Sequence, residues 1–157
     1  MGSIIDFDSF RARQEMMETA RNYIGKIRYK HYRGPTEDQD PLEGMNCYGF
    51  YWLVLGESGV YLPFHGYREM LDLMSPTTAP QLADPIFREE GDNDQPGHVG
   101  FYDPLKETVI HLAKSLVTVQ ETDISWFHPI NGFRSIGPYI EEMLRNERIR
   151  TDAGLAV

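Results

Sequence analysis

Cys47, the only cysteine of the chain, is the residue whose type most directly offers covalent chemistry. It opens the segment CYGFYWLVLGESG, which is apolar nearly all round until Gly56 and predicts a buried helix that begins at Cys47. Unpaired N–H groups and the helix macrodipole favour negative charge at such a position, and the thiolate is the reactive form of cysteine. We therefore expect Cys47 to ionise readily and to act as a nucleophile. The alternative is a buried, inert cysteine, because free cysteine is among the most buried residue types.

Two histidines flank a turn in the segment HVGFYDPLKETVIH. A four-residue hairpin loop over residues 103–106 would pair Tyr102 with Glu107. The same register places His98 directly opposite His111, with their Cβ atoms about 4.5–5.5 Å apart. One imidazole could then act as a base on the thiol while the other holds its second nitrogen and fixes its tautomer.

Two other interpretations of these residues stay open. Cys47, His98 and His111 could bind zinc, which uses Cys and His ligands in a tetrahedron, with Asp92 or Asp103 as the fourth ligand. The histidines could also be ordinary hydrogen-bonded residues at a sheet edge. The other three histidines have no such pairing, and we assign them to loops or the surface: His31, His65 and His128.

The elements that would position these residues follow from periodicity and turn residues. Amphipathic or apolar patterns predict helices over 8–24, 47–56, 66–74 and 138–148. Strand composition covers 98–102, 108–113 and 116–120, with a further strand within 126–136 and a short one at 86–87. Residues 33–46 read as a long loop. Helices first and strands afterwards predict an α+β fold with an antiparallel sheet, in one domain over residues 1–157.

Composition narrows the classes of function. The chain carries 15 Lys+Arg against 24 Asp+Glu, a net charge of −9, which argues against nucleic-acid binding. No apolar run approaches the ~20 residues of a membrane span, and the N-terminus lacks a signal peptide, so we expect synthesis in the cytoplasm and no membrane insertion. One basic stretch stands out, either as a solvated face or as a site for phosphate or an anionic cell-wall substrate: Arg21, Lys26, Arg28, Lys30 and Arg33.

Several motifs resemble those of the NlpC-type cell-wall peptidases, which are papain-like cysteine peptidases. They are NCYGF at 46–50, GHVGFY at 97–102 and VIH at 109–111. Upstream, IGKIRYKH at 24–31 resembles the segment that carries the family's active-site tyrosine. Within this segment, YKH at 29–31 is a variant of the family sequence, and WFHPINGFR at 126–134 shows a weaker similarity to the family. These two features look most similar to the branch found in phage tails and gene-transfer-agent particles.

The resemblance implies a papain-like fold, with N-terminal helices packed on an antiparallel sheet, and a role for each matched residue. Cys47 would be the nucleophile, His98 the general base and His111 the orienting residue. Tyr29 would hydrogen-bond near the reacting carbonyl, and Tyr48 would lie in the substrate pocket beside the oxyanion. The oxyanion itself would be held partly by the Cys47 N–H.

The activity implied is hydrolysis of peptide bonds in peptidoglycan stem peptides, often the bond from γ-D-glutamate to the diamino acid. No metal or organic cofactor is implied. The expected partners are peptidoglycan and phage tail or gene-transfer-agent proteins, and the expected places of action are a virion tail or the cell wall. Asn46 and Tyr48 stand where the family has Asp and Ser. They motivate the alternative of a non-catalytic peptidoglycan-binding or phage tail structural module with the same fold.

Overall fold

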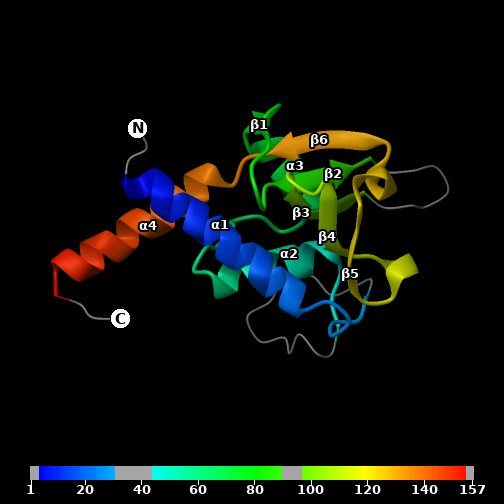
Figure 1. Cartoon of the computed structure of the whole chain (residues 1–157), viewed down its shortest axis with the longest axis horizontal. Helices are drawn as coiled ribbons and strands as arrows, with labels where there is room; N and C mark the ends of the chain where they lie inside the picture. Colours follow the sequence, from blue (N-terminus) through cyan, green and yellow to red (C-terminus); the bar gives the residue numbers. More distant parts are fainter. Residues whose placement is uncertain (1–3, 31–43, 90–96, 155–157) are drawn as a thin grey trace.

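The computed structural model describes residues 4–30, 44–89 and 97–154, in which helices precede strands and one helix closes the chain (Figure 1). Three helices come first: α1 (Ile4–Asn22), α2 (Cys47–Glu57) and α3 (Tyr67–Leu73). Six strands follow: β1 (Pro76–Thr77), β2 (Pro85–Arg88), β3 (His98–Asp103), β4 (Thr108–Leu112), β5 (Val119–Asp123) and β6 (Ile130–Arg134). Two 3₁₀ helices, η2 (Lys114–Leu116) and η3 (Ile124–Phe127), flank β5, and α4 (Gly137–Asp152) ends the fold.

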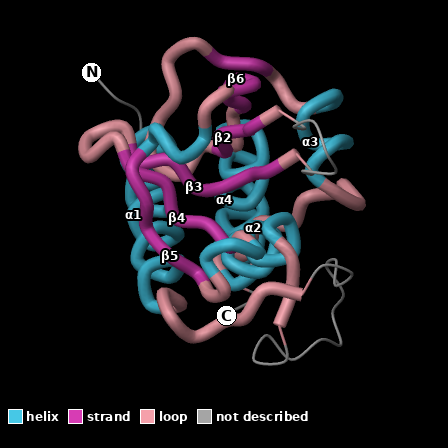
Figure 2. Tube along the Cα trace, turned by 90° about the vertical axis from the view of Figure 1, so that its right-hand side faces the viewer, coloured by secondary structure: helices cyan, strands magenta, loops and turns pink. Residues whose placement is uncertain are grey.

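The strands form one antiparallel sheet in the order β1-β6-β2-β3-β4-β5. Figure 2 shows β6, β2, β3, β4 and β5 succeeding one another in this order. The expected α+β class is therefore confirmed. The short strand expected at 86–87 is β2, which lies between β6 and β3. Pro85 is tolerated because it is the first residue of this strand, where proline's missing N–H does least harm.

The β3–β4 hairpin differs in register from the prediction. The strands pair Tyr102 with Val109 and Asp103 with Thr108, so Tyr102 does not pair with Glu107. Asp103 remains in the strand, and its Oδ1 accepts the N–H groups of Leu105 at 3.0 Å and Lys106 at 3.2 Å across the turn. The loop keeps its predicted length of four residues but begins one residue later. A displacement of the pairing by two residues leaves every side chain on its predicted face.

The strands after this hairpin also begin later than predicted. The strand expected over 116–120 is β5 at Val119–Asp123, because residues 114–116 form the 3₁₀ helix η2. Within the range 126–136, only Ile130–Arg134 is strand, since η3 occupies the residues before it. All four expected helices are present, as α1, α2, α3 and α4. Their ends differ from the predicted ones by a few residues at most.

The sheet separates two apolar clusters. On one face, Phe101 of β3 stacks on Tyr51 of α2, with ring centroids 4.1 Å apart, and meets Phe50 edge-on at 5.8 Å. This cluster includes the buried residues of α1 and α2. The opposite face carries a smaller cluster of Ile86, Tyr102, Val109 and Phe127. Because side chains alternate along a strand, His98 lies on the same face as Tyr102.

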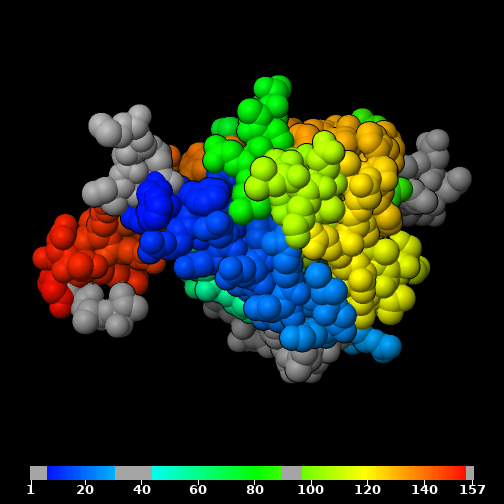
Figure 3. Space-filling view, viewed as in Figure 1, coloured from blue at the N-terminus to red at the C-terminus, as the bar shows by residue number. Residues whose placement is uncertain are grey.

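The first and last helices pack against each other. In Figures 1 and 3, α4 (red) runs beside the N-terminal part of α1 (blue), at the end of the molecule away from β5. In the ranges 4–30, 44–89 and 97–154, no helix has the length and apolar character needed to cross a bilayer.

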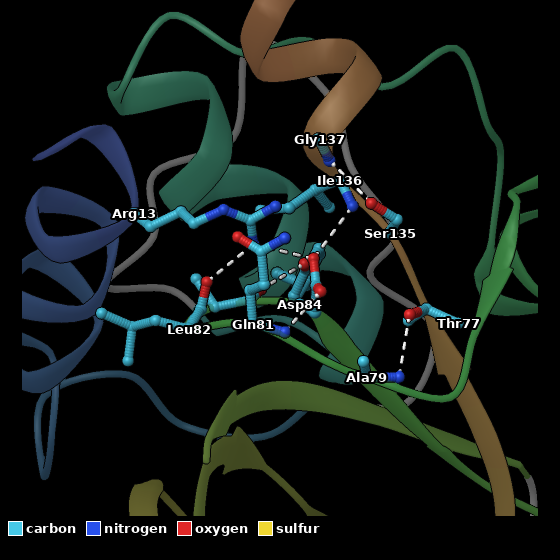
Figure 4. Close-up of polar contacts among 11 residues, drawn as sticks. Arg13, Thr77, Ala79, Gln81, Leu82, Asp84, Ser135, Ile136 and Gly137 are labelled. Carbon is cyan, nitrogen blue, oxygen red and sulfur yellow. Dashed lines mark hydrogen bonds and ion pairs between the residues drawn. The ribbon is translucent and has the colours of Figure 1, made fainter. Parts of the chain in front are cut away.

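A buried ion pair joins these helices to the sheet (Figure 4). Arg13 of α1 donates from Nη1 to Asp84 Oδ1 at 2.8 Å, and both side chains are at most 3% exposed. Asp84 also accepts the N–H groups of Ile136 at 3.0 Å and Gln81 at 2.8 Å, and Arg13 reaches the carbonyl of Leu82 at 2.8 Å. Asp84 thus fixes the start of β2 and the entry to α4, with α1 as the third element.

Replacement of Asp84 by Asn should destabilise the fold by about 3–5 kcal/mol, because it leaves the buried Arg13 guanidinium without a charge partner. Urea unfolding measures this loss. The matched control is Glu141→Gln, which breaks an exposed pair with Arg145 at 3.5 Å and should change the free energy of unfolding by less than about 1 kcal/mol. Equal effects of the two substitutions would contradict the structural role of the buried pair.

Candidate active site

A cleft of about 710 Å³ brings together residues from distant parts of the chain. Four of the five predicted site residues line it: Tyr29, Cys47, Tyr48 and His98. The fifth, His111, lies fully buried behind His98. The other described lining residues are Asn46, His65, Gly66, Tyr67, Arg88, Gly97, Ala113, Lys114, Ser115 and Trp126.

Cys47 is the first residue of α2, as the sequence predicts. Asn46 caps this helix, because its Oδ1 accepts the N–H of Gly49 at 2.7 Å. The backbone N–H groups of Val99, Tyr48 and Cys47 lower the pKa of the thiol and so favour the thiolate. The helix start therefore points donors at the thiol.

Burial nevertheless raises the pKa of the Cys47 thiol to about 11, because desolvation outweighs the three N–H donors. The raised pKa opposes the expectation that Cys47 ionises readily. A thiol with a raised pKa needs a base at the moment of attack.

The imidazoles of His98 and His111 are in direct contact, with His98 Nε2 2.8 Å from His111 Nδ1. The prediction that the two residues lie directly opposite each other is wrong. Extended by one residue, the observed register places Gly100 opposite His111. A Cβ on Gly100 would lie 2.8 Å from His111 Cβ and 2.5 Å from Val109 Cγ1. The absence of a side chain at Gly100 therefore makes room for His111 to lean diagonally toward His98.

A third group extends the pair. His111 Nε2 lies 2.7 Å from Thr122 Oγ1 on the neighbouring strand β5. When His111 donates its Nε2–H to Thr122, its Nδ1 accepts the Nε2–H of His98, and His98 Nδ1 is left unprotonated. Thr122 can thus set both tautomers in the sense that a base on Cys47 requires. No motif in the sequence marks Thr122, although its place on the same sheet face as Val109 follows once the β4–β5 register is known.

Aromatic rings enclose the two histidines. Trp126 and Phe127 of η3 lie with ring centroids 4.6 and 4.8 Å from that of His111, and each is 5.2 Å from His98. Burial lowers the pKa of His98 well below 6.5, helped by His111 and Arg88. Burial, and then Arg88, lowers the pKa of His111 to about 3. Both imidazoles are therefore neutral in the folded protein near pH 7.

The two predicted tyrosines have different positions. Tyr29 is half-buried and held by a 2.8 Å hydrogen bond from its N–H to the Val117 carbonyl. Burial raises its pKa, and so does the nearby Cys47. The Tyr48 hydroxyl donates to the carbonyl of Phe64 at 2.5 Å, and burial raises its pKa as well. Tyr48 therefore contributes its ring to the cleft wall, while its hydroxyl group is already engaged as a donor to a backbone carbonyl.

The loop before α3 contributes a wall that the sequence analysis missed. His65, assigned to a loop or the surface, lines the cleft, and its N–H donates to Glu69 Oε2 at 2.8 Å. The Tyr67 ring lies against Gly97, where an added Cβ would come within 2.2 Å of it. The glycine before His98 is thus what allows Tyr67 to approach the base.

The zinc interpretation is not supported by the placement of its ligands. Asp103 lies at the opposite end of β3 from His98 and pairs with Arg21 at 2.8 Å. Asp92 lies outside the described residues, as do His31 and Arg33. Across the described part of the chain, no group of three or more His, Cys, Asp or Glu side chains could hold a metal ion.

Comparison with known proteins places this fold. No protein-family model matches the chain, and no curated protein does. Among solved structures, an NLP/P60 family protein from Staphylococcus aureus, described as similar to lipoprotein, matches 80% of this chain with a TM-score of 0.61 and 19% identity. An NlpC/P60 family protein from Bacillus cereus matches 82% with a TM-score of 0.62 and 16% identity. The NlpC/p60 domain of the peptidoglycan hydrolase SagA matches 79% with a TM-score of 0.55 and 17% identity.

The matches differ in how much of the other protein they cover. This chain spans 41% and 40% of the first two proteins but 98% of the SagA domain. The likeness shows that the chain has the papain-like α+β fold of NlpC/P60 proteins.

Alkylation of Cys47, the single cysteine, tests whether Cys47 and His98 are uncharged in the free protein. With iodoacetamide, the rate should keep rising through pH 9 toward a midpoint near 11, because burial raises the Cys47 pKa to about 11. His98→Ala should leave this midpoint nearly unchanged, since a neutral imidazole contributes no charge. A rate that levels off below pH 7, and does so only while His98 is present, would instead reveal a thiolate–imidazolium pair.

Proposed function

We propose that this chain is a cysteine peptidase that hydrolyses peptide bonds of peptidoglycan stem peptides through an acyl-enzyme on Cys47. The observation that carries the proposal is a cleft in which a helix-start cysteine lies together with His98, itself hydrogen-bonded to His111 at 2.8 Å. A similar fold in a domain of a peptidoglycan hydrolase supports the choice of substrate. On this proposal, residues 1–157 act as one catalytic domain.

Acylation begins as the Cys47 sulfur attacks the scissile carbonyl carbon and its proton passes to His98 Nδ1. The electrons of the carbonyl double bond move to the oxygen, and the N–H at the start of α2 stabilises the resulting oxyanion. The carbon–nitrogen bond then breaks, and His98 gives its proton to the leaving amine. A thioester joins the acyl group to Cys47.

Deacylation repeats these steps with water. His98 takes a proton from the water as it attacks the thioester, and the proton then returns to the departing sulfur. The carboxylic acid product leaves and the thiol is restored. Because burial lowers the pKa of His98, its protonated form is a strong acid that releases the proton readily at both stages.

His111 acts as the positioning residue of this cycle. Its Nδ1 accepts the Nε2–H of His98, which orients the ring and stabilises the imidazolium form that appears transiently. Thr122 holds His111 in turn through its 2.7 Å contact. Tyr29 lies at the cleft wall beside Cys47 and supplies a hydroxyl near the reacting carbonyl.

The bond that is cleaved and the place of action are proposed from the resemblance of the motifs. We assign the γ-D-glutamyl to diamino-acid bond as the bond cleaved. We also assign the cell wall as the place of action, reached with a phage tail or gene-transfer-agent particle. Support for the particle comes from the segment WFHPINGFR, which forms the end of η3 and all of β6.

A second candidate is a non-catalytic peptidoglycan-binding module. The raised Cys47 pKa favours it, because a thiol with a pKa of about 11 is a poor nucleophile unless a base assists it. Asn46 and Tyr48, which replace the acidic and small residues of the family motif, point the same way. The two candidates differ in whether peptidoglycan fragments are released.

Purified sacculi separate these candidates. The unmodified protein should release soluble muropeptides, and Cys47→Ala should lower the rate by at least about 1,000-fold, because a nucleophile cannot be replaced by binding alone. Mass spectrometry of the fragments names the bond. Glu141→Gln, on the far helix α4, is the control and should retain full activity.

Two results would count against the peptidase. Release at the normal rate by folded Cys47→Ala protein would exclude Cys47 as the nucleophile. Tight sedimentation with sacculi and no fragments from the unmodified protein would establish the binding module instead.

A further inference from the structure

A second hollow adjoins the cleft. It has a volume of about 460 Å³ and is lined by Arg28, Tyr29, Lys30, Lys114 and Val117. Tyr29 and Lys114 also line the cleft that holds Cys47. The two spaces therefore lie side by side at Tyr29 and Lys114, and we name the second one the basic hollow.

Three of the five residues of the basic hollow are cations. Arg28, Lys30 and Lys114 are all exposed, and none forms an ion pair with an acid in the described part of the chain. Arg21 of the same basic stretch is different, since it pairs with Asp103 at 2.8 Å and Glu121 at 3.3 Å. In a chain of net charge −9, three cations around one space form a local site of positive potential.

The backbone of the basic hollow is held on both sides. The backbone of Arg28 forms an antiparallel β-bridge with that of Thr118. The Lys30 N–H donates to the Met45 carbonyl at 2.8 Å. Gly44, at φ +105°, permits this packing, since a Cβ there would come within 2.8 Å of the Arg28 carbonyl oxygen and 2.9 Å of Lys30 Cγ. Arg28 and Lys30 are thus carried by a segment in fixed contact with its neighbours.

We propose that the basic hollow binds a carboxylate of the peptide whose scissile bond lies in the cleft. The inference rests on the proposed peptidase function and adds a requirement on the substrate, namely a free carboxylate on the Tyr29 side of the bond that is cut. The Arg28 guanidinium offers paired donors that match a carboxylate, and the two lysines add point charges. The net charge of −9 disfavours a long polyanion at the same place.

Binding of two matched peptides tests the subsite without catalysis. Cys47→Ala protein is titrated calorimetrically with a stem peptide carrying free carboxylates and with the same peptide in which they are carboxamides. The acid form should bind about 10-fold more tightly. The double substitution Arg28→Gln and Lys114→Gln should remove this preference by weakening the acid form alone.

Lys26→Gln is the matched control, because Lys26 is an exposed cation of the same basic stretch that does not line the basic hollow. It should leave the preference intact. In protein that retains Cys47, the double substitution should raise KM for the acid peptide about 10-fold and leave kcat unchanged, as expected for a binding contact.

The possible outcomes distinguish a failure of the carboxylate subsite from a failure of the proposed peptidase activity. Equal affinity for acid and amide peptides, or equal effects of the double substitution and Lys26→Gln, would overturn the subsite even if hydrolysis is observed. A preference for the acid peptide that depends on Arg28 and Lys114, without hydrolysis by the Cys47 form, would support the subsite and overturn the peptidase. Tighter binding of polyglycerol phosphate than of the acid peptide would overturn the assignment to a peptide carboxylate.

Discussion

The hydrogen bond between His98 and His111 is the interaction on which the rest of the site depends. Two imidazoles buried under Trp126 and Phe127 lose their water and need partners within the protein. They satisfy each other at 2.8 Å, and Thr122 satisfies the far nitrogen. Three neighbouring strands are needed for this chain of contacts, and the sheet order β3-β4-β5 supplies them.

The charges of the molecule are arranged around this neutral centre. Burial raises the pKa of Cys47 and lowers the pKa values of both histidines, so it disfavours the charged form of all three. Full charges stand around these groups: Arg88 and Lys114 line the cleft, and the buried Arg13–Asp84 pair fixes the start of β2. Chemistry in such a cleft requires proton transfer during the attack, which makes the orientation of His98 more important than the resting pKa of Cys47.

Local patterns and tertiary contacts determined different parts of this structure. The helix start at Cys47 followed from an uninterrupted apolar run, and the nearness of His98 and His111 followed from strand alternation around a short loop. The exact register did not, because it depends on the Asp103 carboxylate capping the turn. Neither the raised Cys47 pKa nor the contact to Thr122 could be predicted, since burial and the β4–β5 register arise from residues distant in sequence.

Trapping of the acyl-enzyme tests directly whether Cys47 is the nucleophile. The protein is mixed with a stem peptide, quenched in acid within the first turnovers, and measured by intact-mass spectrometry followed by peptide mapping. We expect a mass increase equal to the acyl half of the substrate, located on the peptide that contains Cys47, and its absence in His98→Ala protein. Turnover of the peptide without an adduct on Cys47, or with an adduct on another residue, would contradict it.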